Sequence, residues 1–360
     1  MKTKRVFAVL IAALMLAGLA GCGKKAEEKP VTYEIAMVTD TSSIQDGAFN
    51  QAVWDGIEDF VEEKPVSYKA YLTTEDTTDG YLRAVKDAVD GGAEMVIAAG
   101  SAFGNTVYQA QSEYPQVSFA LIDGRPQDNQ GKDSEIRKNT VAVTFAEEQA
   151  GYLAGYAAVK EGYKKLGFLG GKEEPPVQRF GYGFIQGADD AAKDDGLSGI
   201  QVRYCYTGTF SEDEAVKGRA LDWYEQGTEV IFAGAGAAGR SVMKAAEEKN
   251  GRVIGVDQDQ SKDSKTVICS AVKNIRPAIS DILWEYYGDD EFAGGQAIVL
   301  DAKTQGVGLA MNGPAMKTFS ADEYDRLYKK LAEGSIEIRH SDVKDAGTLA
   351  TERIHVEVEK

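Results

Sequence analysis

Short apolar segments alternate with amphipathic segments along most of the chain, and this alternation restricts its fold more than any other feature. Residues 33–40 (YEIAMVTD), 95–100 and 117–124 have the composition of buried strands. The segment after the first strand has a helical period, and its apolar residues fall on one face: Val53, Trp54, Ile57, Phe60 and Val61. Strands that alternate with helices form parallel sheets that helices cover on both faces.

A second series of the same kind begins near residue 147. Its strand-like segments are KLGFLGG, IQVRYCYTG, EVIFAGA and RVIGVD. Without the N-terminal segment the chain has about 340 residues, which is more than one hydrophobic core usually serves. We therefore predict an α/β fold with two doubly wound parallel sheets, one in each of two lobes.

The first 22 residues have the layout of a lipoprotein signal. Lys2, Lys4 and Arg5 precede an apolar stretch from Val6 to Leu19, which is shorter than the roughly 20 apolar residues of a membrane-spanning helix. The stretch ends in LAGC, which resembles a bacterial lipobox. We expect cleavage before Cys22 and a diacylglycerol on its thiol, the alternative being a plain secretory signal with an incidental cysteine.

Residues 23–30 (GKKAEEKP) are polar and charged, so they cannot bury enough apolar surface to order themselves. We expect residues 22–31 to be a tether between the membrane and the folded part. The chain has 57 acidic and 40 basic residues and a net charge of -17. A field of this sign repels phosphate-rich partners, which excludes nucleic acid.

Cysteine, histidine and glycine patterns argue against an enzyme. Cys205 and Cys269 lie in apolar runs and are predicted to be buried thiols, with an oxidised pair as the alternative. No Cys/His cluster has zinc spacing, and no predicted strand end carries a nucleophile with a base. The AGAGAAG run lacks the GK[ST] ending of a P-loop. We therefore predict no catalytic residue, metal or cofactor.

Ligands of doubly wound sheets bind beyond the carboxyl ends of the strands. In the first series Asp40 and Asp123 follow predicted strands. The candidates in the second series are Arg179, Phe180, Phe210, Gly236 and Asp257. Aromatic rings, carboxylates and flexible glycines at these positions favour a flat ligand with hydroxyl groups.

The same residues have structural explanations that the sequence leaves open. Phe49 and Phe210 have the position of hydrophobic staples for the helices that follow them, and Asn50 that of an N-cap. Asp123 and Asp257 have the position of turn residues.

Seven motifs occur in the same order as in one family of lipoproteins. They are IQDGAFNQAVWDG, ALIDG, TVAVTFAEEQAGYLAG, QRFGYGFIQG, TGTFSEDEAVKGRA, EVIFAGAGAAG and VIGVDQDQ. Together they resemble the basic membrane protein family, which includes the PnrA-like purine nucleoside receptors, from residue 33 to about residue 340. The resemblance implies a type I periplasmic-binding-protein fold, with two lobes joined by a hinge of three crossovers.

The resemblance also implies a domain division. Residues 1–21 are expected to be the lipoprotein signal peptide. Residues 32–145 with 272–294 would form the N-terminal lobe, and residues 146–271 with 295–340 the C-terminal lobe. Residues 341–360 stay unassigned.

Family members stack a purine between two aromatic rings, one from each lobe, and these rings match Phe49 and Phe210. The family often has Lys-Ser before the first ring, where this chain has Gly47-Ala48. This departure affects the rim of the expected pocket and removes neither ring. Stacking contributes roughly 1–3 kcal/mol per base in open sites.

Polar contacts are implied in the same way. Asn50 and Asp123 match residues that bond the base edge, and Asp257 matches a carboxylate that takes ribose hydroxyls. Lys273 lies near a family lysine that reaches the sugar. Vicinal hydroxyls are donors that suit carboxylates at Asp40 or Asp257, whereas a nucleotide phosphate would be repelled by them.

The implied function is a lipid-anchored substrate-binding protein of an ABC importer on the extracytoplasmic face of the cell membrane. It would capture a purine nucleoside of the inosine, adenosine or guanosine class as a monomer and deliver it to an ABC permease and its ATPase. The alternatives are a binding protein for another small solute, such as a sugar, a flavin or a signalling molecule, and a nucleoside-processing enzyme.

Overall fold

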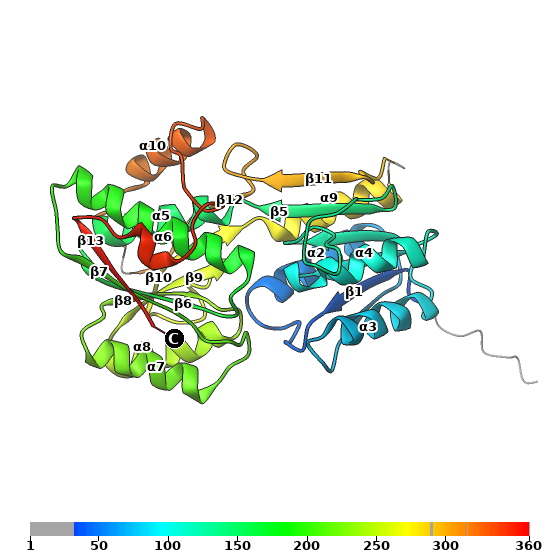
Figure 1. The fold of residues 1–360 in the computed structure, drawn as a ribbon, viewed down its shortest axis with the longest axis horizontal. Coiled ribbons are helices and arrows are strands. Elements are labelled where there is room, and N and C mark those ends of the chain that lie inside the picture. The colour runs from blue at the N-terminus through cyan, green and yellow to red at the C-terminus, as the bar shows by residue number, and fades with distance from the viewer. Residues whose placement is uncertain (1–31, 289–290, 315, 360) are drawn as a thin grey trace, which may run out of the picture. The chain divides into compact units, whose positions relative to one another are not determined.

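The computed structural model describes residues 32–288, 291–314 and 316–359. The expected signal peptide, the tether and Cys22 lie outside the described residues. Two separate β-sheets organise the described part of the chain (Figure 1). This confirms the predicted α/β fold class.

The first sheet has the strand order β11-β5-β4-β3-β1-β2, and all its pairs are parallel. Its strands are β1 (Ile35–Thr39), β2 (Tyr68–Leu72), β3 (Met95–Ala99), β4 (Ser118–Ile122), β5 (Thr140–Phe145) and β11 (Gln296–Leu300). The helical elements of this part are α2 (Phe49–Glu63), α3 (Thr78–Asp90), η1 (Ser101–Phe103), α4 (Gly104–Glu113) and α9 (Ile275–Tyr287).

Alternate residues of β1 show how helices cover both faces of this sheet. Ile35 and Met37 belong to the same buried cluster as Val53 of α2 and Ile279 of α9. Ala36 and Val38 belong to another cluster, with residues of α3 and α4. Successive side chains of a strand point to opposite faces, so an uninterrupted apolar strand is buried on both sides.

The second sheet has the strand order β12-β10-β9-β8-β6-β7-β13. Its strands are β6 (Lys165–Gly170), β7 (Ile200–Tyr206), β8 (Val230–Gly234), β9 (Arg252–Asp257), β10 (Val267–Lys273), β12 (Val307–Ala310) and β13 (Ile354–Val358). The helical elements of this part are α5 (Glu147–Lys160), α6 (Pro175–Asp194), α7 (Glu214–Glu225), α8 (Ala238–Lys249), α10 (Ala321–Ala332) and η2 (Ala346–Leu349). Strand β12 is antiparallel to β10, and the other pairs are parallel.

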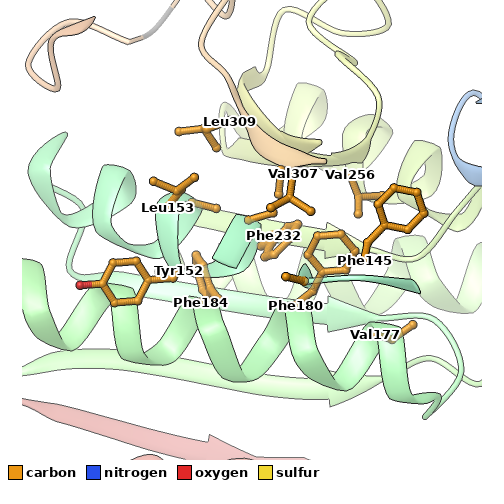
Figure 2. Close-up of a cluster of buried hydrophobic side chains, with 14 of the residues drawn as sticks. Phe145, Tyr152, Leu153, Val177, Phe180, Phe184, Phe232, Val256, Val307 and Leu309 are labelled. Atoms are coloured by element: carbon orange, nitrogen blue, oxygen red, sulfur yellow. The ribbon is translucent and has the colours of Figure 1, made fainter. Parts of the chain in front are cut away.

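Helices α5 and α6 pack unusually closely on one face of the second sheet. A Cβ atom added to Gly155 of α5 would lie 1.9 Å from the carbonyl oxygen of Phe184, and one added to Gly187 of α6 would lie 1.9 Å from that of Tyr152. The glycines of the AGYLAG and FGYGFIQG motifs therefore permit backbone contact between two helices. Figure 2 shows the apolar side chains beside this helix pair, including Phe180, Phe184 and Phe232.

The chain passes between the two sheets three times. It leaves the first sheet after β5, returns to it after β10, and leaves it again after β11. We call residues 33–145 with 275–300 the first half, and residues 146–273 with 301–359 the second half.

Two boundaries differ from those expected from the sequence. The range 295–340 was expected in the C-terminal lobe, but β11 pairs with β5 of the first sheet from Gln296 to Leu300. Residues 272–273, expected in the N-terminal lobe, complete β10 of the second sheet. The reason is that strand membership depends on long-range backbone hydrogen bonds, which composition does not reveal. The unassigned tail supplies β13, which pairs with β7.

The thiols of Cys205 and Cys269 are buried and free, as predicted. Ser320 and Glu323 form the capping box of α10. Among the described residues, no helix has the length and apolar character needed to cross a membrane.

Candidate ligand-binding site

A cavity between the two halves collects most of the residues predicted to contact a ligand. It has about 700 Å³ of empty space, including open solvent at its mouth. The predicted residues that line it are Asp40, Phe49, Asn50, Asp123, Phe180, Phe210, Gly236, Asp257 and Lys273. Parallel strands from both sheets end at this cavity, so one pocket joins residues far apart in the sequence.

Phe49 and Phe210 bring one half-buried ring each from opposite halves. Phe49 is the first residue of α2, and Phe210 follows β7. A Cβ atom added to Gly171 would lie 2.3 Å from the Phe210 ring, and one added to Gly236 would lie 3.4 Å from Phe210 Cβ. The glycine at position 171 therefore leaves room for the Phe210 ring at the cavity wall, whereas a Cβ atom at position 236 would make only an ordinary contact with it.

Lys273 is the last residue of β10 and lines the cavity, with 2% of its side chain exposed. Its ammonium group donates a hydrogen bond to Asp123 Oδ2 and lies 3.2 Å from Asp257 Oδ1 and 3.7 Å from Glu147 Oε1. Burial opposes its charge, but these three carboxylates raise the pKa of Lys273 above its ordinary value. The side chain is therefore a buried cation.

Aromatic rings surround the same ammonium group. Lys273 Nζ lies 4.8 Å from the ring centroid of Phe49, 5.4 Å from that of Phe180 and 5.5 Å from that of Phe145. An ammonium group within about 6 Å of a ring face is attracted by the ring quadrupole. Lys273 thus connects the carboxylates of the cavity to the ring of Phe49.

Asp123 and Asp257 adopt the same unusual backbone conformation at the ends of β4 and β9. Their φ angles are 63° and 65°, in the left-handed region that Asp tolerates better than most residues. Burial raises the pKa of Asp123 to about 7 against the opposing effect of Lys273, and burial also raises the pKa of Asp257. Asp123 Oδ1 accepts no hydrogen bond from the residues that the structure describes, which leaves it available to a ligand donor. Asp257 Oδ1 is ion-paired with Lys273.

The sequence matches the family described as ABC transporter substrate-binding protein PnrA-like over residues 33–348. The chain belongs to this family.

Its relatives agree with the match. The ABC transporter nucleoside-binding protein BmpA of Lactococcus lactis is 30% identical over 86% of this chain and 92% of the relative. Basic membrane protein D of Borreliella burgdorferi is 29% identical over 88% of this chain and 89% of the relative. A crystal structure of an ABC transporter solute-binding protein from Aeropyrum pernix shares the fold, with a TM-score of 0.76 and 21% identity over 87% of this chain and 95% of that one. This chain is thus an ABC transporter substrate-binding protein of the PnrA-like family.

Asn50 has a different local role in this PnrA-like protein from the N-cap that the sequence left open. Helix α2 begins at Phe49, so Asn50 lies inside the helix. Its Oδ1 accepts a hydrogen bond from Thr39 Oγ1 at 2.9 Å, while its Nδ2 donates to Ser43 O at 3.5 Å. The amide therefore faces the cavity with its oxygen already bonded to β1.

Arg179 was predicted at the ligand, but it lies outside the set of residues that line this cavity. Its Nε donates to Glu147 Oε2 at 2.5 Å, and it lines a neighbouring cavity that shares Asp123 and Glu174 with the first. Phe180 does line the first cavity, yet its ring also packs edge-on against Phe232 in the core. The strand-end rule located this segment, whereas helix α6 determines where each side chain points.

Several lining residues were missing from the predicted site. Asp46 accepts hydrogen bonds from the backbone N–H groups of Ala48, Asn50 and Gln51, and burial raises its pKa to about 6. Ser101 and Glu174, which come from opposite halves, bond each other at 2.6 Å. Ser101 follows β3, so the strand-end rule could have found it. Glu174 lies in the loop between β6 and α6, so the same rule reaches it.

Proposed function

We propose that this protein is a lipid-anchored, extracytoplasmic receptor that captures a purine nucleoside between its two halves and delivers it to an ABC permease and its ATPase. The observation that carries the proposal is the pair of rings, Phe49 and Phe210, which come from opposite halves to one cavity. A purine base offers two apolar faces to such rings and a polar edge to the groups between them.

The polar lining favours a ligand rich in hydrogen-bond donors. Five carboxylates line the cavity, at Asp40, Asp46, Asp123, Glu174 and Asp257, against one ammonium group at Lys273. Ribose hydroxyls donate to carboxylates, whereas a phosphate would be repelled by them. This argues for the free nucleoside over the nucleotide. The name of the Lactococcus lactis relative, a nucleoside-binding protein, agrees with this proposal.

Titration calorimetry with inosine, adenosine and guanosine tests the ligand, with AMP and ribose as controls. We expect at least one nucleoside to bind much more tightly than either control. Saturating nucleoside at about 100 times its dissociation constant should also stabilise the fold by about 2.7 kcal/mol. Binding of a flavin or a sugar without binding of any nucleoside would replace the proposed ligand, and release of free base would indicate an enzyme.

Closure is the proposed mechanism of capture, with the three chain crossings acting as the hinge. A ligand drives closure only if it binds the closed form better than the open form. Small-angle scattering with and without saturating inosine should show a smaller radius of gyration in the complex. An unchanged radius despite calorimetric binding would contradict closure on binding.

A further inference from the structure

The four residues before Phe49 are held from across the cavity. Three of their carbonyl groups accept hydrogen bonds from side chains of the second half. Arg240 Nη2 donates to Gln45 O at 3.2 Å. Gln260 Nε2 donates to Gly47 O at 2.9 Å, and Gln258 Nε2 donates to Ala48 O at 2.8 Å. We call residues 45–48 the acceptor segment.

Two of the donors lie in the loop that begins at Asp257. Gln260 is buried and fixed within the second half, because its Oε1 accepts from Val256 N at 3.0 Å and its own N–H donates to Ser270 Oγ at 3.1 Å. Its Nε2 is thereby aimed at the first half. Gln258 is half-buried, and its side chain reaches Ala48 O. One short loop therefore supplies both a cavity carboxylate and two donors to the opposite half.

The acceptor segment is shaped by its own half. The Asp46 carboxylate accepts three backbone N–H groups at the start of α2, as described above, and this fixes the turn into the helix. Gly47 has a φ of 70°, and a Cβ atom there would lie 2.6 Å from Arg240 Nη2. The turn thus presents the carbonyl groups of Gly47 and Ala48 to the second half. A larger residue at position 47 would have to adopt this left-handed backbone and displace the Arg240 guanidinium group.

We propose that Gln258 and Gln260 are positioning residues for ligand binding. Their side-chain amides donate hydrogen bonds to the carbonyl groups of Ala48 and Gly47, and these two bonds, which we call the clasp, hold Phe49 against the ligand in the closed protein. The inference rests on the proposed function. The loop that places Asp257 at the ligand thereby also locks the ring of the other half. The two hydrogen bonds of the clasp therefore form in the same closure that encloses the ligand.

The clasp is expected to slow dissociation of the ligand and so to lengthen the lifetime of the complex. Its bonds join groups on different halves, so they break when the cleft opens and contribute little to reaching the encounter complex. A neutral hydrogen bond changes an equilibrium constant by up to about tenfold. Since both partners are uncharged, this effect should depend little on salt, unlike that of the Lys172–Asp76 ion pair, which also joins the two halves.

The test measures the association and dissociation rate constants of inosine by stopped flow. Gln258→Ala removes one donor, and Gln258→Glu places an acceptor against the Ala48 carbonyl. Lys262→Ala, at an exposed position of the same loop, is the control. We expect dissociation to accelerate about threefold to tenfold in Gln258→Ala and more in Gln258→Glu, with association within twofold of wild type. Lys262→Ala should match wild type.

A second readout separates positioning from folding. Spin labels at Thr74→Cys and Glu214→Cys, exposed positions on different halves, report the distance between the halves with saturating inosine. In Gln258→Glu the distribution should broaden toward longer distances, while the melting temperature of the protein without inosine stays that of wild type. Unchanged dissociation and distances in both Gln258 variants would overturn the clasp. Failure of wild type to bind any of the three nucleosides would instead overturn the proposed function.

Discussion

Asp123 and Asp257 lie at the ends of strands in different sheets, and both are paired with the same ammonium group, that of Lys273. Both have a left-handed backbone, with φ values of 63° and 65°. Lys273 belongs to the second half and Asp123 to the first, so their hydrogen bond also joins the two halves. The lining of the cavity therefore includes a charge cluster to which both halves contribute.

Replacing Lys273 by Met should destabilise the protein strongly. The substitution leaves the carboxylates of Asp123, Asp257 and Glu147 buried together without their cation. Removing one partner of a buried ion pair costs about 3–5 kcal/mol. Urea unfolding at pH 8 should show a loss of this size, and Lys262→Met at an exposed position should show none. A Lys273→Met midpoint equal to that of wild type would mean that the cluster is not buried.

Stability should fall as the pH rises from 5 to 7.5. The pKa of Asp123 is about 7 in the folded protein and 3.8 ordinarily, so between these values the folded state holds a proton that the unfolded state has lost. The free energy of unfolding then decreases with pH, by at most about 1.4 kcal/mol per pH unit for one proton. Urea midpoints across this range should fall more steeply in wild type than in Asp123→Asn. Parallel curves for the two proteins would contradict the raised pKa.

Glu147 should affect binding without touching the ligand. It lies outside the set of residues that line the cavity, is fully buried, and joins Arg179 to the ammonium group of Lys273. We expect Glu147→Gln to weaken inosine binding roughly tenfold, about 1.4 kcal/mol, because Lys273 loses one of its three carboxylates. Glu148→Gln is the matched control, since that side chain lies 3.9 Å from Arg179 and has no ion pair with Lys273 in the described structure. Equal affinities of the two variants in calorimetry would show that Glu147 has no specific effect on inosine binding.

The two stacking rings should matter more for binding than for folding. Phe49→Ala and Phe210→Ala should each weaken nucleoside binding at least tenfold, about 1.4 kcal/mol, while circular dichroism stays that of wild type. Phe292→Ala removes another half-buried ring, one that packs on Tyr286, and should leave affinity unchanged. Full affinity in either ring variant would mean that this ring does not contact the ligand.

Anchoring should depend on Cys22. If its thiol carries the lipid, Cys22→Ala should move the protein from the membrane fraction to the soluble fraction of cells. Cys205→Ala, which removes a buried thiol of β7, should leave the fractionation unchanged. A Cys22→Ala protein that stays with the membrane would contradict the lipobox interpretation.

The sequence by itself determined the fold class and several of the strand ends that meet at the cavity. Successive residues of an apolar run such as 35–39 point to opposite faces of a sheet, so both faces must be covered. Parallel strands place their carboxyl ends on one edge. This is why Asp123, Phe210 and Asp257, each named from its place at a strand end, line one cavity. The family resemblance added Phe49, Asn50 and Lys273. Lys273 ends strand β10, whereas Phe49 and Asn50 begin helix α2, where the strand-end rule does not apply.

Only the tertiary structure decided which groups meet. Strand β11 joins the first sheet through backbone bonds to β5, more than 140 residues away in the chain. Arg179 bonds Glu147 and does not line the cavity, since α6 fixes the direction of its side chain. Gln258 and Gln260 find carbonyl partners about 210 residues earlier. Local sequence records the preferences of a segment, but hydrogen-bond partners and shared charges depend on distances that exist only once the two halves have come together.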